Sequence, residues 1–284
     1  MPELPEVEYV ARQLREALVG ARIMRVEVFW SRAVSRVSPE ELVARLTGRR
    51  VLAVGRRAKY LVLTLDSGES LVIHRRMSGN LRLARADEAA PYTRAAFTLG
   101  NGRRLLFTDP RKFGRITIVS PEELPALFRS LGPEPLDSDF TPEVLAERLA
   151  GRRRAIKTTL LDQSVVAGLG NIYADEALFR AGIHPLRSAA TLTPDEIAAL
   201  HAGIQSALLT GIEHGGTTFG RHRGLYDEQG SNLEHVEVYR RTGQPCLRCG
   251  TPIVRIRIAQ RSAHFCPHCQ PVPTVAETSE ISAS

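Results

Sequence analysis

Two groups of residues near opposite ends of the chain have types and spacing suited to chemistry. The first is Pro2, because removal of Met1 would leave its secondary amine as a free amino terminus. The second is a pair of CxxC sequences separated by sixteen residues, formed by Cys246, Cys249, Cys266 and Cys269. An amine suits covalent catalysis and four thiolates suit a metal ion. We therefore expect a reaction centre at one end and a metal module at the other.

The amine of Pro2 suits attack on a sugar. An α-amino group has a pKa of about 8, far below that of lysine, so a useful fraction is neutral near neutral pH. Attack by a secondary amine on C1′ gives an iminium that has no N–H proton to lose, and this lasting charge favours elimination of the β and then the δ phosphate. Glu3 could exchange protons with the sugar during base loss. Composition alone leaves open a second interpretation, in which Pro2 and Pro5 only stiffen the chain before a helix.

The four cysteines predict one structural zinc ion, because zinc prefers four tetrahedral ligands and binds thiolate strongly. Between the CxxC pairs, Ile253–Ile258 alternates apolar and basic residues as a hairpin strand does, so its arginines should face outward. The turn near Gln260–Ser262 should then project toward a phosphate backbone. A redox CxxC is the alternative, but two paired sequences favour zinc, with His264 and His268 as bystanders.

Composition and charge indicate a globular protein with an anionic partner, and DNA is the first candidate. Of the 284 residues, 43% are apolar and 24% are charged; 38 Lys and Arg against 31 Asp and Glu give a net charge of +7 and a pI near 9.6. Such a pI is typical of nucleic-acid-binding domains, although each basic pair is equally well explained as solvated surface. No apolar run approaches the roughly 18 residues of a membrane span. The start lacks a signal-peptide pattern and every cysteine lies in a CxxC pair, so we expect a cytoplasmic protein.

The N-terminal half predicts a helix followed by an antiparallel β-sandwich. Apolar residues at helical spacing share one face from Val7 to Leu18, and Gly20 ends the pattern. Asn101-Gly102 marks a hairpin. Alternating segments bounded by turn residues predict strands at Ile23–Phe29, Val51–Val54, Tyr60–Leu65, Leu71–His74, Leu81–Leu83, Ala95–Leu99, Arg104–Thr108 and Arg115–Val119.

The C-terminal half predicts helices after a linker rich in Pro and Gly at Leu131–Asp137. Asn171 is the expected N-cap of the third helix. Gly220–Glu234 has a weak pattern and is expected to be a mobile loop, and Gln270–Ser284 a polar tail. The predicted helices are Pro142–Leu149, Ile156–Asp162, Ile172–Ala181 and Pro194–Glu213.

A set of short sequences extends these observations, and with them the chain resembles the bacterial formamidopyrimidine-DNA glycosylase family over most of its length. The resemblance implies a monomeric enzyme that excises oxidised purines, chiefly 8-oxoguanine and formamidopyrimidines, from double-stranded DNA and then nicks the strand by β,δ-elimination. Besides the CxxC pairs, the sequences are Pro2-Glu3-Leu4-Pro5-Glu6-Val7-Glu8, Arg57-Ala58-Lys59-Tyr60-Leu61, Met77-Ser78-Gly79, Thr108-Asp109-Pro110-Arg111-Lys112-Phe113-Gly114, Gly170-Asn171-Ile172-Tyr173-Ala174, Gly182-Ile183-His184-Pro185 and Gly215-Gly216-Thr217-Thr218.

The resemblance also implies roles for individual residues. Pro2 matches the Schiff-base nucleophile and Glu3 its acid/base partner, while Lys59 matches the proton-transfer lysine of β-elimination and Arg261 the arginine of δ-elimination. Met77, Arg111 and Phe113 match the residues that fill the gap left by the flipped-out nucleotide. Lys157 and Asn171 match phosphate-binding positions. The remaining expected DNA contacts are His74, Tyr92 and Arg152.

By the same resemblance the fold class is α+β, with an N-terminal helix and an antiparallel β-sandwich followed by a helix-two-turn-helix domain and a β-hairpin zinc ribbon. The expected boundaries are 1–131 for the catalytic sandwich, 132–140 for a linker, 141–235 for the helix-two-turn-helix domain with its lesion loop, 236–270 for the ribbon and 271–284 for a disordered tail.

Three departures from the family pattern keep other interpretations open. The chain has His74-Arg75-Arg76-Met77-Ser78-Gly79 where the family usually has His-Leu-Gly-Met-Ser-Gly. Before the hairpin, Tyr92-Thr93-Arg94 replaces the usual pair of histidines. Phe219–Glu234 matches the lesion loop poorly. An oxidised-pyrimidine glycosylase with the same amine chemistry is one alternative. A non-catalytic zinc-ribbon DNA-binding protein is another, although the presence of Pro2, Glu3 and Lys59 argues against it.

Overall fold

The computed structural model describes residues 1–217 and 223–272, which form two compact units. Unit 1 comprises Met1–Arg129 and Gly211–Leu233, and unit 2 comprises Ser130–Thr210 and the chain from Glu234 onward. Residues 219–222 of the expected lesion loop and 273–284 of the expected tail lie outside the described residues. Within the described ranges, no helix is both long and apolar enough to cross a membrane.

Helix α1 (Leu4–Leu18) opens unit 1 and follows the predicted pattern. Pro5 lies in its first turn, where a missing N–H costs nothing, and the apolar face from Val7 to Leu18 is buried. Glu6 Oε2 accepts the backbone N–H of Glu3 at 2.7 Å, which satisfies a donor that the helix leaves free. The sequence after the helix turns at Gly20, whose φ is 84°. The first residues of the chain are therefore fixed to a packed helix.

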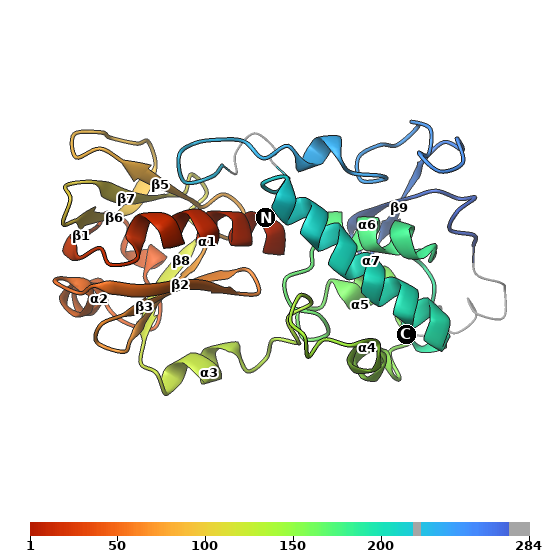
Figure 1. The fold of residues 1–284 in the computed structure, drawn as a ribbon, viewed down its shortest axis with the longest axis horizontal. Helices are drawn as coiled ribbons and strands as arrows, with labels where there is room; N and C mark the ends of the chain where they lie inside the picture. The colour runs from red at the N-terminus through yellow and green to blue at the C-terminus, as the bar shows by residue number, and fades with distance from the viewer. Residues whose placement is uncertain (218–222, 273–284) are drawn as a thin grey trace. The chain divides into compact units, whose positions relative to one another are not determined.

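Two four-stranded antiparallel sheets pack on α1 and confirm the predicted sandwich (Figure 1). Side chains that face inward from both sheets, among them Leu63, Ile73, Phe97 and Phe107, form one core with the apolar face of α1. One sheet has the order β1 (Ile23–Val28), β6 (Thr93–Leu99), β7 (Arg104–Thr108) and β5 (Asn80–Ala84). The other has the order β2 (Val51–Arg57), β3 (Tyr60–Leu65), β4 (Ser70–His74) and β8 (Arg115–Val119).

Unit 1 also contains short helices that the strand pattern did not predict. The 3₁₀ turn η1 (Ser31–Ala33) and helix α2 (Pro39–Leu46) follow β1, and α3 (Glu123–Phe128) follows β8. Ser38 caps α2 by accepting the N–H of Glu41 at 3.1 Å. A serine followed by proline and glutamates is a helix-start signal, so α2 was detectable in the sequence.

Unit 2 contains the predicted helices α4 (Pro142–Leu149), α5 (Ile156–Leu160) and α6 (Asn171–Ala181), and α7 (Pro194–Glu213) runs from unit 2 into unit 1. The expected N-cap at Asn171 was wrong by one residue. Gly170 is the cap, with φ −137° and ψ −158°, and Asn171 is the first helical residue. The short 3₁₀ turn η2 (Ala189–Thr191) precedes α7.

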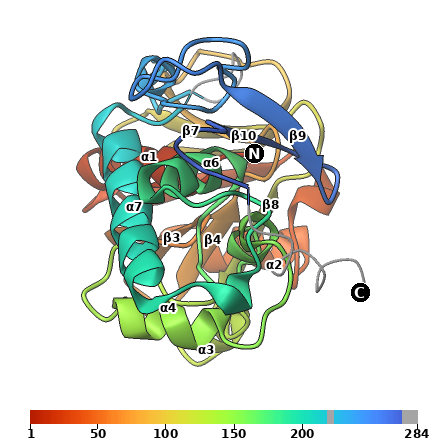
Figure 2. The ribbon, with the colours of Figure 1, turned by 90° about the vertical axis from the view of Figure 1, so that its right-hand side faces the viewer.

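A two-stranded hairpin completes unit 2 (Figure 2). Strands β9 (Val254–Ile258) and β10 (Arg261–Phe265) pair from Arg261 opposite Ile258, and the two turn residues between them have positive φ. Arg255 and Arg257 are exposed, as the alternation predicted. The turn carries Arg261 at its end, so the hairpin presents three exposed arginines.

Residues 223–233 correct the expectation of a loosely held loop. Leu225 is fully buried in the core of unit 1. Its carbonyl accepts the N–H of Leu83 at 2.9 Å, and its own N–H donates to Gln13 Oε1 at 2.8 Å. The segment then enters the 3₁₀ turn η3 (Asn232–Glu234). Between Gly224 and Gly230, Leu225 is the one aliphatic residue, and a single position gives no periodicity from which its burial could be predicted.

We predict that Leu225→Ala destabilises unit 1 by about 2–5 kcal/mol, because it leaves a cavity in a close-packed core. Chemical denaturation followed by circular dichroism measures the change. The matched control is Leu52→Ala, which truncates a leucine of the same unit that is 52% exposed. A Leu225→Ala protein as stable as the Leu52→Ala protein would contradict the anchoring of this segment.

Candidate functional site

The predicted nucleophile and its neighbour lie at the beginning of α1. Pro2 and Glu3 are buried, whereas Met1 is 44% exposed and holds the Pro2 nitrogen in an amide. Glu6 fixes this terminus from both sides, since its Oε1 accepts the N–H of Thr217 at 2.7 Å while its Oε2 binds Glu3. Gly216, with φ 80°, is required beside it because a Cβ there would lie 2.7 Å from Glu6 Cγ. Removal of Met1 would therefore expose an amine on a rigid support.

Lys59 belongs to the same unit, in the turn between β2 and β3. Its side chain is buried, and the preceding Ala58 has a φ of 50°. His74, at the end of β4, is also buried and accepts the N–H of Arg76 on Nδ1 at 2.9 Å. Burial, followed by the nearby charges of Arg76 and Lys59, lowers the pKa of His74 to about 3. The imidazole is therefore neutral near neutral pH and orients the turn that follows it.

Met77, Arg111 and Phe113 come from two loops that one carboxylate ties together. Asp109 is buried; its Oδ2 accepts the N–H of Gly114 at 2.7 Å, and its Oδ1 accepts that of Arg111 at 3.2 Å and the hydroxyl of Ser78. Met77 is 41% exposed and Phe113 46% exposed, and the Arg111 guanidinium lies 4.9 Å from the centre of the Phe113 ring. The structure thus brings the three expected gap-filling residues to one edge of unit 1.

Tyr92 lies on the same edge. It is exposed, has a φ of 61°, and its carbonyl accepts the N–H of Asp109 at 3.0 Å. Arg94 donates to the Asp109 carbonyl at 2.8 Å. Asp109 and Ser78 belong to two of the short sequence motifs, but neither residue was a predicted site residue. An aspartate before proline in a loop is a turn signal that could have identified this carboxylate.

In unit 2, Asp175 joins α5, α6 and β10. It binds the ammonium of Lys157, and its Oδ2 accepts both the backbone N–H and the ring Nδ1 of His264, each at 3.0 Å. Lys157 is 1% exposed, so its charge is compensated inside the protein and is not presented on the surface. Among the described residues, the group that could hold a metal ion consists of the four cysteines, without His264. His264 is instead a structural partner of Asp175.

Two of the expected phosphate contacts meet at Ser262, next to the exposed Arg261. The Lys157 ammonium donates to the Ser262 carbonyl at 2.5 Å, and Asn171 Nδ2 donates to the Ser262 hydroxyl at 3.4 Å. The other expected contact of this unit, Arg152, lies elsewhere and pairs with Asp162 at 3.4 Å. The hairpin turn that carries Arg261 is therefore supported from α5 and α6.

The four cysteines form a metal centre. Their sulfurs all lie within 4.8 Å of one another, with separations of 3.9 Å for Cys246–Cys269 and 3.5 Å for Cys249–Cys266. A tetrahedron with Zn–S bonds of about 2.3 Å has edges of roughly 3.8 Å. The donor set and its dimensions therefore fit one structural zinc ion, as the spacing predicted.

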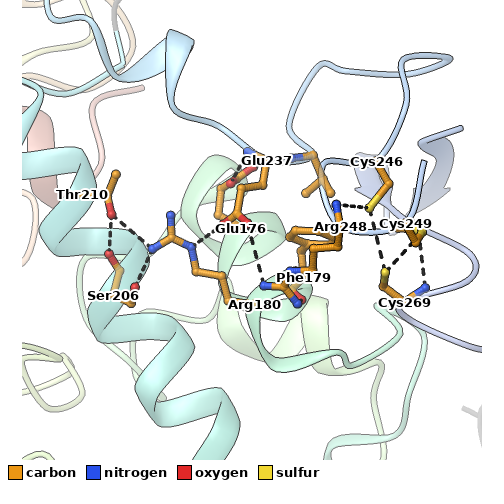
Figure 3. Close-up of polar contacts among 12 residues, drawn as sticks. Glu176, Phe179, Arg180, Ser206, Thr210, Glu237, Cys246, Arg248, Cys249 and Cys269 are labelled. Atoms are coloured by element: carbon orange, nitrogen blue, oxygen red, sulfur yellow. Dashed lines mark hydrogen bonds and ion pairs between the residues drawn. The ribbon is translucent and has the colours of Figure 1, made fainter. Parts of the chain in front are cut away.

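Helix α6 anchors the ribbon (Figure 3). Glu176 accepts the backbone N–H groups of Glu237, Val238 and Tyr239 at 2.7–3.0 Å. Burial raises the pKa of Glu176 to about 7, although these hydrogen bonds oppose the shift. Arg248, inside the first CxxC pair, donates to the Phe179 carbonyl at 3.1 Å. Nothing in the local sequence pattern identified Glu176.

Family models match three consecutive parts of the chain. They are the formamidopyrimidine-DNA glycosylase N-terminal domain at residues 1–116, the formamidopyrimidine-DNA glycosylase H2TH domain at 131–222, and a zinc finger found in FPG and IleRS at 243–272. A formamidopyrimidine-DNA glycosylase of Roseiflexus sp. (strain RS-1) is 51% identical over 273 residues, which cover 95% of this chain and 100% of the relative.

Solved structures give the same result. The chain is similar to a mutant of the Lactococcus lactis FPG in complex with DNA containing Fapy-dG, with a TM-score of 0.89, 37% identity, and coverage of 95% of this chain and 100% of that one. It is also similar to wild-type Lactococcus lactis FPG in complex with DNA containing an oxidised pyrimidine, with a TM-score of 0.88, 36% identity and the same coverage. Three consecutive family matches, a relative with half of its residues identical, and a shared fold lead to one conclusion: this chain belongs to the formamidopyrimidine-DNA glycosylase family.

Proposed function

We propose that the chain is a bifunctional DNA glycosylase and AP lyase of base excision repair. Its substrate is double-stranded DNA carrying an oxidised purine, such as 8-oxoguanine or a formamidopyrimidine, and it acts as a monomer. The observation that carries the proposal is the Pro2–Glu3 terminus, buried and fixed by Glu6 at the start of α1 in a chain of this family. The similarity to an FPG bound to DNA containing Fapy-dG supports this substrate class.

In the proposed reaction, loss of Met1 frees the Pro2 amine. Its nitrogen attacks C1′ of the damaged nucleotide, the bond from C1′ to the base breaks, and the base leaves with a proton. Glu3 protonates the sugar ring oxygen, and opening of the ring leaves an iminium between Pro2 and C1′. Lys59 then accepts the C2′ proton, which expels the 3′ phosphate. Arg261 assists the second elimination, in which loss of the C4′ proton expels the 5′ phosphate. Water then hydrolyses the iminium, which frees the Pro2 amine and leaves C1′ as an aldehyde.

DNA contacts divide into two kinds. Met77, Arg111 and Phe113 occupy the space of the extruded nucleotide, and their common edge and exposure support this role. The contacts that position the backbone come from His74, Tyr92, Arg152, Asn171 and Arg261, with Lys157 acting through Ser262 because its ammonium is buried.

The domain limits and cellular location follow from the same proposal. By sequence, residues 1–131 are assigned to the catalytic domain, 132–140 to the linker, 141–235 to the DNA-binding helical domain with its lesion loop, 236–270 to the ribbon and 271–284 to a tail. Within this division, Gly211–Leu233 belong to the same compact unit as the catalytic domain. Reduced thiolates at the zinc centre suit a cytoplasmic enzyme that reaches the nucleoid through DNA.

Excision of oxidised pyrimidines is a second candidate activity, favoured by the similar FPG solved with DNA containing such a base. The amine chemistry is the same for both substrates because it acts on the sugar. Comparing excision rates on 8-oxoguanine and oxidised-pyrimidine duplexes of one sequence decides between the two. A faster rate on the pyrimidine would reverse the proposed preference.

We predict that an N-terminal extension abolishes covalent trapping of the protein on an 8-oxoguanine duplex by borohydride, because it keeps the Pro2 nitrogen in an amide. The matched control is the same preparation after a protease has removed the extension so that the chain begins at Pro2. DNA binding should survive in both. Trapping by the extended protein as efficient as by the processed one would exclude Pro2 as the nucleophile.

Zinc is expected to support DNA binding and not the chemistry. Cys249→Ser removes one of four thiolates, so the zinc content should fall well below the expected value of about one per chain. DNA affinity should fall with it, because the hairpin that carries Arg261 depends on the ribbon. Elemental analysis and a binding titration measure both effects, with His268→Ala as the control that keeps all four sulfurs. Native protein without zinc would refute the assignment.

The gap-filling residues should matter most when a base must be extruded. Unstacking costs a few kcal/mol, so Phe113→Ala or Arg111→Ala should slow excision of 8-oxoguanine about 10- to 100-fold. Nicking of a preformed abasic site should be slowed less than excision. The loss caused by Arg111→Ala should depend more on the base opposite the lesion than the loss caused by Phe113→Ala, since a guanidinium can hydrogen-bond the edge of that base. Single-turnover assays on matched duplexes test this. Equal losses on both substrates would assign the residues to general binding.

A further inference from the structure

Arg75 is the most deeply buried cation of unit 1 among the described residues, with 1% of its surface exposed. Four of its hydrogen bonds lie inside the unit. Nε donates to the Gly79 carbonyl at 3.1 Å and Nη1 to the Glu6 carbonyl at 3.2 Å. Nη2 donates to Asn80 Oδ1 at 2.7 Å and to the Arg223 carbonyl at 3.2 Å. The guanidinium thus donates hydrogen bonds to three separate segments of the chain, at Glu6, at Gly79–Asn80 and at Arg223.

These three stretches carry different parts of the proposed site. The Glu6 carbonyl belongs to the first turn of α1, directly after Pro2 and Glu3. Gly79 and Asn80 end the turn that carries Met77, and Arg223 leads into the buried Leu225. Arg75 therefore connects the catalytic terminus with the Met77 turn through a single planar group.

The Met77 turn has little freedom to adjust on its own. The Gly79 N–H donates to the Arg75 carbonyl at 2.9 Å, and a Cβ at Gly79 would lie 2.4 Å from that oxygen. Ser78 is held by Asp109 at the same time. Since the turn is closed on itself, the bond from Arg75 to the Glu6 carbonyl joins it as one piece to the first turn of α1.

Arg75 stays charged in this position. Burial lowers the pKa of the guanidinium to about 10, and the Glu6 carboxylate opposes the shift. A protonated guanidinium must keep its donors satisfied when buried, so it holds its acceptors in one planar arrangement. A leucine at this position would offer no such bonds. The proposed amine chemistry makes no use of the Arg75 guanidinium, so its bonds serve the arrangement of the site.

We propose that Arg75 is a positioning residue that fixes Met77 relative to the Pro2–Glu3 terminus. Met77 then enters the vacated space at a fixed position relative to the terminus that receives C1′. The inference rests on the proposed function, because it concerns the extrusion step of that reaction. It predicts that loss of Arg75 slows damaged-base removal more than strand cleavage.

The experiment compares wild type, Arg75→Leu and Arg75→Lys in single-turnover reactions on two duplexes of one sequence, one with 8-oxoguanine and one with a preformed abasic site. Arg75→Leu should slow excision about tenfold or more, because a misplaced Met77 no longer fills the space of the extruded nucleotide and unstacking costs a few kcal/mol. It should change abasic nicking by less than about threefold, because no damaged base needs extrusion there. Arg75→Lys, which keeps the charge but not the planar fork, should fall between the two.

A spectroscopic readout separates positioning from general loss of structure. Fluorescence of 2-aminopurine placed beside the lesion rises when the neighbouring base leaves the stack, and this rise should be slower in Arg75→Leu. The matched control is Arg45→Leu, which removes a partly buried arginine of unit 1 bonded to Glu41 and Glu69. It should leave the ratio of excision to abasic nicking unchanged.

The outcomes are distinct. An unchanged ratio of excision to nicking in Arg75→Leu, at equal folded fraction, would overturn the inference. If Arg75→Leu does not fold, Asn80→Ala removes one acceptor, and an unchanged ratio in Asn80→Ala and Arg75→Lys would overturn it equally. A wild-type protein that removes no oxidised base would overturn the proposed function itself.

Discussion

The arrangement of the proposed site depends on the buried carboxylate of Glu6. A nucleophile at the amino terminus needs support, because the first residues of a chain are usually the least ordered. Glu6 supplies it by accepting one N–H from Glu3 and another from Thr217, two residues more than 200 positions apart. Each bond satisfies a backbone donor of a buried residue. These bonds tie the terminus to the helix behind it.

The same device recurs at the other positions where function is proposed. Asp109 accepts N–H groups within its own loop and the hydroxyl of Ser78, which fixes the edge that carries Met77 and Arg111. Asp175 and Glu176, neighbours on α6, bind β10 and the first residues of the ribbon. Charge-assisted bonds to backbone N–H are stronger than neutral ones and fix direction as well as distance. The backbone of these loops is therefore fixed, and their exposed side chains are held in position to contact DNA.

Charge in this protein is used in two ways. Some arginines form bonds within the protein: Arg75 is buried, Arg180 pairs with Glu237, and the exposed Arg248 donates to the Phe179 carbonyl. Others are exposed where a phosphate backbone could reach them, including Arg111 and the arginines of the β9–β10 hairpin. The net charge of +7 counts both kinds of arginine equally.

The sequence alone determined the features that depend on near neighbours. Strand and helix periodicity, the Asn101-Gly102 turn and the spacing of the cysteines each reflect contacts within a few residues, and the elements they predict are present. The resemblance added the expected roles of Lys59 and Arg111. Tertiary structure decided the remainder: the burial of Lys157 against Asp175, the packing of Leu225 and the four-bonded Arg75. Each of these joins residues that are distant in the chain, and local pattern carries no information about which distant donor a buried acceptor will meet.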